Sequence, residues 1–191
     1  MDPTIKFSKI VFLCLLGLGS AAPYTLKAQG SDSPYLPFHL KQSDSVSSLK
    51  DLLSSVESQL FEKTNQQRKD KKLSSLEFNI TLYKAALLHS QDMLKRRYFS
   101  HFSPEGKFVL DRIRKFKPGY DESCGENLHQ IYSEKGLRDP SAIAEQMMKD
   151  WMSSPEHRKN ILSKEYTLMG IACSSDGFRI FCTQVFSAGP L

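Results

Sequence analysis

The chain has 191 residues, of which 40% are hydrophobic and 25% charged, so it is long enough for one domain with a substantial apolar core. Its 26 Lys and Arg against 21 Asp and Glu leave a net charge of +5. The basic residues are not interleaved with stacking aromatics, which argues against nucleic-acid binding and leaves a weak attraction to anionic surfaces.

The N-terminus has the pattern of an export signal. Two lysines precede an apolar run over residues 10–18, and small residues follow up to Ala22. This order is typical of a secretory signal peptide cleaved after Ala22 or Ala28, and the run is short for a membrane span. We therefore expect residues 1–28 to be a signal peptide. The exported protein would be secreted, periplasmic or on the cell surface, with no transmembrane span; an uncleaved anchor is the alternative.

The next segment leads into helices. Residues 29–45 are rich in Ser, Pro, Asp and Gln, a composition that favours a flexible lead-in. Leucine and valine then recur at helical spacing, which predicts a first helix over 46–69. We place the lead-in and the start of this helix at 29–55, and a domain at 56–189. Asn79 precedes a second predicted helix.

The second half changes from helical to strand patterns. Short helices are expected over 111–116 and from Glu126 to about 133, and a longer helix over 142–152. Residues 169–173 and 178–186 have period-two patterns, which predict a closing hairpin. Early helices followed by a hairpin predict an α+β fold.

Three cysteines follow the signal, an odd number for an exported protein. Cys173 and Cys182 lie on the two predicted strands and could form a disulfide. A symmetric two-residue turn at Asp176-Gly177 would instead pair Cys173 with Ile180, which weakens that case. A bridge from Cys124 to one of them, or three free thiols, are the alternatives.

A run of residues before the predicted strands has the pattern of a helix start. Ser154 is expected as N-cap and Pro155 at the first helical position, which places His157 in the first turn. The positive end of a helix disfavours the imidazolium, and neutral imidazole is the form that binds a metal or accepts a proton.

Two further candidate site residues, His101 and Glu126, lie in short motifs that contain turn-forming residues. His101 follows an aromatic pair and precedes a predicted turn at 103–106, which would make it available to a cleft. Glu126 stands between Gly125, which permits special backbone geometry, and Asn127, whose amide can bond nearby backbone groups.

Together these motifs resemble the secreted CAP superfamily (cysteine-rich secretory, antigen 5 and pathogenesis-related proteins, or SCP domain), in a short bacterial-type form. The resemblance covers about 57–189 and rests on residues 65–68, 85–93, 98–101, 103–106, 125–128, 151–162 and 183–186. It implies a three-layer α-β-α sandwich with a small central antiparallel sheet. It also implies that His101, Glu126 and His157 surround a shared cleft.

Three readings of these side chains remain open. Two imidazoles and water could hold zinc or another divalent cation, with Glu126 as ligand or as base towards bound water. Glu126 and a histidine could relay a proton without metal. The trio could also be a structural polar cluster. The amides and hydroxyl that would support the cleft are those of Asn127, Ser154, Asn160 and Gln184.

One departure from the family argues against catalysis, and we assign no catalytic residue. Many eukaryotic members carry a second glutamate three residues after the tryptophan, where this chain has Ser154. We therefore expect a binding protein, not an enzyme, with a small amphiphile, a peptide or an envelope or host component as ligand. No cofactor is required. The alternatives are a metal- or carboxylate-assisted hydrolase of peptide or ester bonds, and a scaffold that uses the basic loop at 112–119.

Two other histidines are given structural roles. His89 lies on the apolar stripe of the second helix and is expected to be a satisfied core histidine. His129 follows Glu126 by three residues, so it could share its helical face, although a surface or interface position is favoured.

Overall fold

The computed structural model describes residues 42–189 and 191, so the predicted signal peptide and most of the lead-in lie outside the described part of the chain. Its helices and strands are, in chain order, α1 Gln42–Asp70, β1 Glu77–Phe78, α2 Ile80–Arg96, α3 Val109–Arg114, β2 Cys124–Tyr132, α4 Pro140–Ser153, α5 Pro155–Ile161, β3 Leu168–Ser175 and β4 Arg179–Ser187. The fold class is α+β, as the sequence predicts. None of the helices in this part of the chain is both long and apolar enough to span a bilayer.

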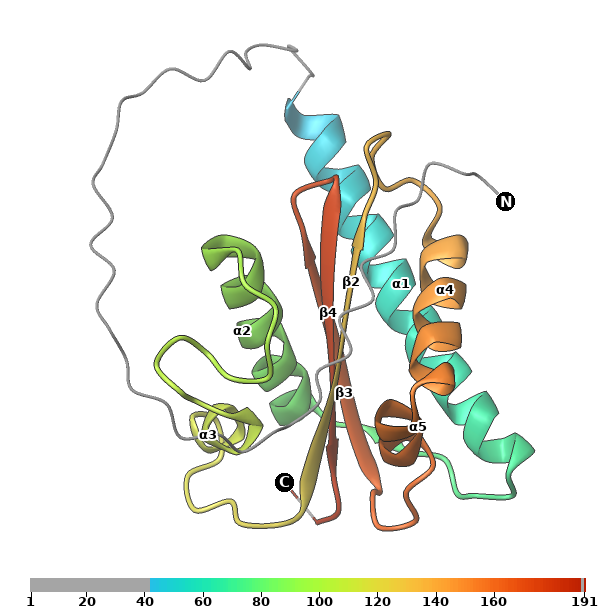
Figure 1. Cartoon of the computed structure of the whole chain (residues 1–191), viewed down its shortest axis with the longest axis vertical. Helices are drawn as coiled ribbons and strands as arrows, with labels where there is room; N and C mark the ends of the chain where they lie inside the picture. Colours follow the sequence, from blue (N-terminus) through green and yellow to red (C-terminus); the bar gives the residue numbers. More distant parts are fainter. Residues whose placement is uncertain (1–41, 190) are drawn as a thin grey trace.

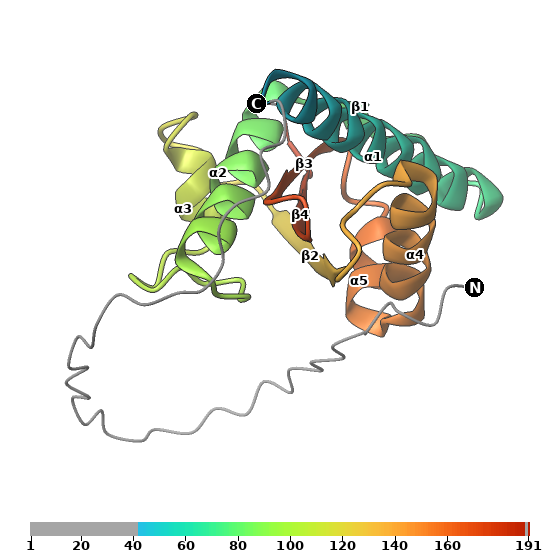
Figure 2. The same ribbon diagram turned by 90° about the horizontal axis from the view of Figure 1, so that it is seen from above.

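The four strands form one sheet in the order β1-β3-β4-β2. The pairs β2–β4 and β3–β4 are antiparallel, whereas the two-residue strand β1 runs parallel to β3. Helices α2 and α3 cover one face of the sheet, and α1, α4 and α5 cover the other (Figures 1 and 2). The result is the three-layer sandwich that the family resemblance implies.

Each helical layer buries its own apolar cluster against the sheet. Trp151 of α4 is fully buried in the cluster under α1, α4 and α5, and its Nε1 donates to the Leu128 carbonyl on β2 at 3.0 Å. On the other face, Leu82 of α2 packs with Val185 of β4. A side chain at Gly170 would come within 2.1 Å of the α2 backbone, so glycine lets this helix approach the sheet closely.

Residues 124–132 form a strand, so the predicted short helix from Glu126 is wrong. Leu128 and Ile131 are three residues apart, a spacing that suits a helix. In the structure β2 pairs with β4 along its whole length, from Cys124 opposite Ser187 to Tyr132 opposite Arg179. Because helices cover both faces, this strand lacks the alternating pattern of a half-exposed one.

The β3–β4 hairpin has a register that differs from the expected one. Cys173 lies opposite Cys182, not opposite Ile180, and the two cysteines form a disulfide. The backbone N–H of Asp176 bonds to the carbonyl of Arg179, so the turn lies one residue further along than predicted. The Asp176 carboxylate accepts from two turn amides, and the next residue, Gly177, takes a positive φ of 93°. Cys124 is free.

A buried arginine ties three segments together at one end of the molecule. Arg68, near the end of α1, is 2% exposed and donates four hydrogen bonds, all to backbone carbonyls. The acceptors belong to the α1–β1 connection, to α5 and to the loop that follows it: Ser74, Ile161, Ser163 and Tyr166. Asn65 bonds both backbone groups of Leu76 from the same helix. These contacts give the 65–68 motif a structural role.

Candidate functional site

The site begins in the loop that follows α2. The helix ends at Arg96, the C-cap residue Arg97 takes a left-handed conformation, and a tight turn from Ser103 to Gly106 follows. The Ser103 hydroxyl accepts from the backbone N–H groups of Glu105 and Lys107, so the turn is stabilised from within. This loop presents His101 towards β2, with its side chain 42% exposed.

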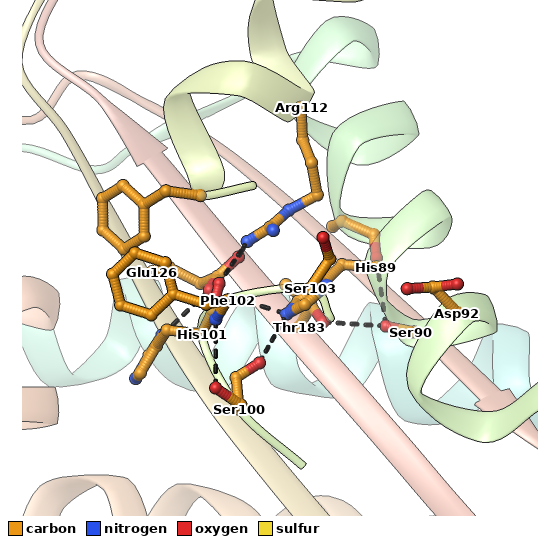
Figure 3. Close-up of polar contacts among 12 residues, drawn as sticks. His89, Ser90, Asp92, Ser100, His101, Phe102, Ser103, Arg112, Glu126 and Thr183 are labelled. Carbon is orange, nitrogen blue, oxygen red and sulfur yellow. Dashed lines mark hydrogen bonds and ion pairs between the residues drawn. The ribbon is translucent and has the colours of Figure 1, made fainter. Parts of the chain in front are cut away.

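Glu126 on β2 lies directly behind His101, and its side chain is completely buried. One carboxylate oxygen, Oε1, accepts from His101 Nδ1 at 2.9 Å, and the other, Oε2, accepts from the Arg112 guanidinium (Figure 3). Burial alone would raise the pKa of Glu126. The hydrogen bond from His101 and the charge of Arg112 outweigh it and hold that pKa below its usual value. Glu126 is therefore a sealed, ionised carboxylate and does not line a solvent-accessible cleft.

Arg112 is the central residue that the sequence analysis missed. It is 5% exposed and also donates to the carbonyls of His101 and Lys107, so it ties the loop to the strand. Its Nε is buried without a hydrogen-bond partner among the described residues. A signal existed in the sequence: Val109, Arg112 and Ile113 have the i, i+3, i+4 spacing of an inward helix face.

His89 supports the same loop from α2. It is 1% exposed, its Nε2 lies 2.9 Å from the Ser100 carbonyl, and its Nδ1 lies 3.5 Å from the Tyr98 hydroxyl. Burial lowers the pKa of His89 to about 4, so the ring is neutral and Nε2–H is the donor to Ser100. Glu126 Oε1 is 3.9 Å from this nitrogen. His89 is thus a buried, hydrogen-bonded core histidine.

His157 belongs to α5, which lies on the opposite face of the sheet from α2 and α3 (Figure 2). It stands in the first turn after Pro155, and Ser154 is the N-cap residue, both as predicted, although the Ser154 side chain makes no capping hydrogen bond. Burial lowers the pKa of His157 to about 4, with further lowering from the charges of His101 and His129. The three rings are therefore near enough to interact electrostatically. The His157 ring has no hydrogen-bond partner among residues 42–189 and 191.

Three amide side chains brace the segment that carries His157. Asn127 Nδ2 donates to the His157 carbonyl at 3.2 Å and to Gln184 Oε1 at 3.0 Å. Asn160 Nδ2 donates to Asn127 Oδ1 and to the Glu126 carbonyl. Each of these amides thus bonds a neighbour, and together they fix α5 against β2.

His129 occupies a different environment from the one predicted. It lies on a strand, where residues three apart point to opposite faces, so it does not share a face with Glu126. Its Nε2 lies 2.9 Å from Asp150 Oδ2, its ring meets Trp151 edge-on, and its buried Nδ1 has no hydrogen-bond partner in the described part of the chain.

The geometry fixes the chemistry of His101. Because the ionised Glu126 accepts from Nδ1–H, the neutral form of His101 has its lone pair on Nε2, which has no hydrogen-bond partner within the described ranges. A carboxylate behind a histidine in this way sets its tautomer and raises its basicity as a ligand. No group of three or more His, Cys, Asp or Glu side chains in the described chain is placed to hold a metal ion. Protein ligands here would be the two imidazoles of His101 and His157.

The low pKa of His89 predicts an acid-sensitive fold. Its folded pKa of about 4 lies below the ordinary 6.5, so the unfolded chain takes up a proton between these values that the native ring does not. Stability from this group is complete above about pH 6.5 and is lost as the pH falls towards 4. We expect the advantage of the native protein over His89→Gln to shrink by about 2 kcal/mol between about pH 7 and about pH 4.5.

Urea unfolding followed by Trp151 fluorescence measures this difference at each pH. Comparison with the variant removes the contributions of other groups, notably Glu57, whose pKa burial raises to about 7 and which acts in the opposite direction. A stability difference that stays the same at both pH values would show that His89 is not held neutral by the fold.

Comparisons with known proteins agree with the fold. The model of the cysteine-rich secretory protein family, CAP, matches residues 61–186. The chain is 33% identical over 141 residues to the protein YkwD of Bacillus subtilis (strain 168), a stretch that is 74% of this chain and 51% of YkwD. It therefore spans about half the length of that relative.

Two solved structures have the same architecture. An extracellular protein with an SCP domain from Bacillus anthracis str. Ames has a TM-score of 0.59 at 29% identity, over 73% of this chain and 42% of that one. An outer surface protein from Borrelia burgdorferi has a TM-score of 0.56 at 21% identity, over 69% of this chain and 90% of that one. The second likeness concerns the fold alone.

Proposed function

Since the chain belongs to the cysteine-rich secretory protein (CAP) family, we propose that its domain is a binding module that takes a divalent cation, preferably zinc, on His101 and His157. The observation that carries this proposal is the hydrogen bond between His101 and the buried Glu126. Glu126 accepts from Nδ1–H of His101, which leaves the Nε2 lone pair free on a ring that is 42% exposed. The ring of His157 is neutral, because burial lowers its pKa to about 4.

The donor set fits an open site with two protein ligands. Imidazole nitrogens suit zinc, and water or a ligand group would complete its coordination. Glu126 is not available as a third ligand, because His101 and Arg112 occupy its two oxygens. A cation held in this way would attract carboxylate, phosphate or carbonyl oxygens of a bound molecule, such as an amphiphile, a peptide or an envelope or host component.

The same geometry favours binding over hydrolysis. A general base must reach the proton that it removes, but the Glu126 side chain has no exposed surface and is ion-paired with Arg112. Ser154, which stands where many family members have a second glutamate, has no carboxylate to take over this role. Export follows as part of the proposal, since a similar structure is that of an extracellular protein.

Zinc titration tests the proposal directly. Isothermal titration calorimetry of the native protein should show one weak site. Removal of one imidazole, as in His157→Ala, should weaken zinc binding at least about tenfold, because it takes away half of the protein ligands. The double variant His101→Ala/His157→Ala should show no binding heat, while circular dichroism stays native.

The matched control is His129→Ala, a third histidine of the same end of the molecule that already bonds Asp150. This variant should keep the zinc affinity of the native protein. Equal zinc affinity in the native protein and the double variant would place the cation elsewhere and overturn the proposal.

A further inference from the structure

A pair of exposed phenylalanines lies beside His101. Phe102 is 54% exposed and Phe108 is 38% exposed, and their rings stack with centroids 5.1 Å apart. Figure 3 shows Phe102 next to His101. Phe116, also 38% exposed, follows α3. Exposed apolar side chains that gather in one segment indicate an interaction surface.

Most exposed charged side chains of this segment, residues 99–117, are basic. Its exposed basic side chains are Lys107, Arg114, Lys115 and Lys117. Its two carboxylates are fewer than these basic side chains: Glu105 pairs with Arg96 of α2, and Asp111 accepts from the Phe108 backbone N–H at the start of α3. The partner that complements this surface therefore combines an apolar phase with negative charge.

The backbone of the loop offers little to an extended peptide. The N–H of Phe102 bonds to Ser100 Oγ, and those of Glu105 and Lys107 bond to Ser103 Oγ. Peptide recognition by a loop commonly uses such main-chain groups, and here they are already satisfied. What remains is a stacked, exposed aromatic pair in a segment that also carries exposed basic side chains, a combination that suits the interface of a bilayer.

We propose that residues 99–117 form a docking surface for an anionic lipid bilayer. Phe102 and Phe108 enter the interface between headgroups and acyl chains, while Lys107, Lys115 and Lys117 contact anionic headgroups. Helix α3 lies on the side of α2 away from α4 and α5 (Figures 1 and 2), so a bilayer can approach it without meeting the other helical layer. This inference goes beyond the proposed function and does not depend on zinc.

Vesicle co-sedimentation of the exported protein tests the surface. At about 0.1 M salt, the protein should bind vesicles that contain roughly a third phosphatidylglycerol at least about tenfold more tightly than pure phosphatidylcholine vesicles. F102S/F108S and K107E/K115E/K117E should each weaken binding to the anionic vesicles at least about tenfold. Serine at position 108 keeps a good N-cap for α3, so the aromatic variant should fold.

Each variant has a matched control. Phe178 in the β3–β4 turn is 53% exposed, so F178S removes an equally exposed ring from another surface. K50E/K71E/K164E changes the net charge by the same amount on exposed positions of α1 and of the loops after α1 and α5. Both controls should bind within about twofold of the native protein.

Four results would overturn the inference: no binding of the native protein to anionic vesicles, equal losses in the controls, no loss in F102S/F108S, or equally tight binding to a soluble anionic polypeptide such as polyglutamate. A zinc titration of F102S/F108S should match the native protein. It therefore separates failure of this docking surface from failure of the metal site.

Discussion

Replacing Arg68 with methionine should lower the free energy of unfolding by about 3–5 kcal/mol, because four carbonyls, two of them in buried hydrogen bonds, lose their donor together. Methionine approximates the volume of the arginine stem, so the change removes hydrogen bonds more than packing. Each lost bond to a charged donor is worth about 1.5–3 kcal/mol, and relief from burying an uncompensated charge offsets part of the total. Urea unfolding followed by Trp151 fluorescence measures the loss.

Two further variants separate this role from a general effect on α1. Lys71→Met, just beyond the end of the helix at an exposed position, should leave the transition unchanged. Arg68→Lys should fall between the native protein and Arg68→Met, since an ammonium keeps the charge but cannot reach carbonyls of three segments at once. If Arg68→Met unfolded like the native protein, the buried guanidinium would not hold these segments together.

The helices and the closing hairpin could be predicted from periodicity, whereas β2 could not. Helices α1, α2 and α4 each present an apolar stripe to one side, so spacing alone located them to within a few residues. Strand β2 carries Glu126, Asn127 and Leu128 buried in succession, because both faces of the sheet are covered. A doubly covered strand loses the alternation that distinguishes it from a helix.

The candidate site shows the same limit. The family resemblance placed His101 and Glu126 together, and the two side chains are in contact. Arg112 lies 14 residues from Glu126 and pairs with it only because α3 folds back over the strand. Within its own segment Arg112 resembles the exposed cations around it. Its spacing with Val109 and Ile113 indicates an inward position, but only the packing of α3 identifies Glu126 as its partner.

Replacing Glu126 with glutamine should lower the free energy of unfolding by about 3–5 kcal/mol, since it leaves the Arg112 guanidinium buried without an anion. The double variant Glu126→Gln/Arg112→Met removes both charges. It should therefore be less destabilised than the sum of the two single variants, by about 1–3 kcal/mol of coupling in urea unfolding. The control is Glu105→Gln, which breaks an exposed ion pair with Arg96 in the same loop and should not shift the transition.

This cycle also decides between two roles for the carboxylate. If Glu126 orients His101 as part of a buried ion pair, Glu126→Gln should lower stability and zinc affinity together, because the amide can no longer act as a charged acceptor for Nδ1–H. A general base would behave differently. Its loss would abolish turnover while the free energy of unfolding stayed near the native value, because the carboxylate would take part in catalysis and would not stabilise the fold. Additive single and double variants, with unchanged stability in Glu126→Gln, would contradict the structural role and return Glu126 to the list of candidate catalytic groups.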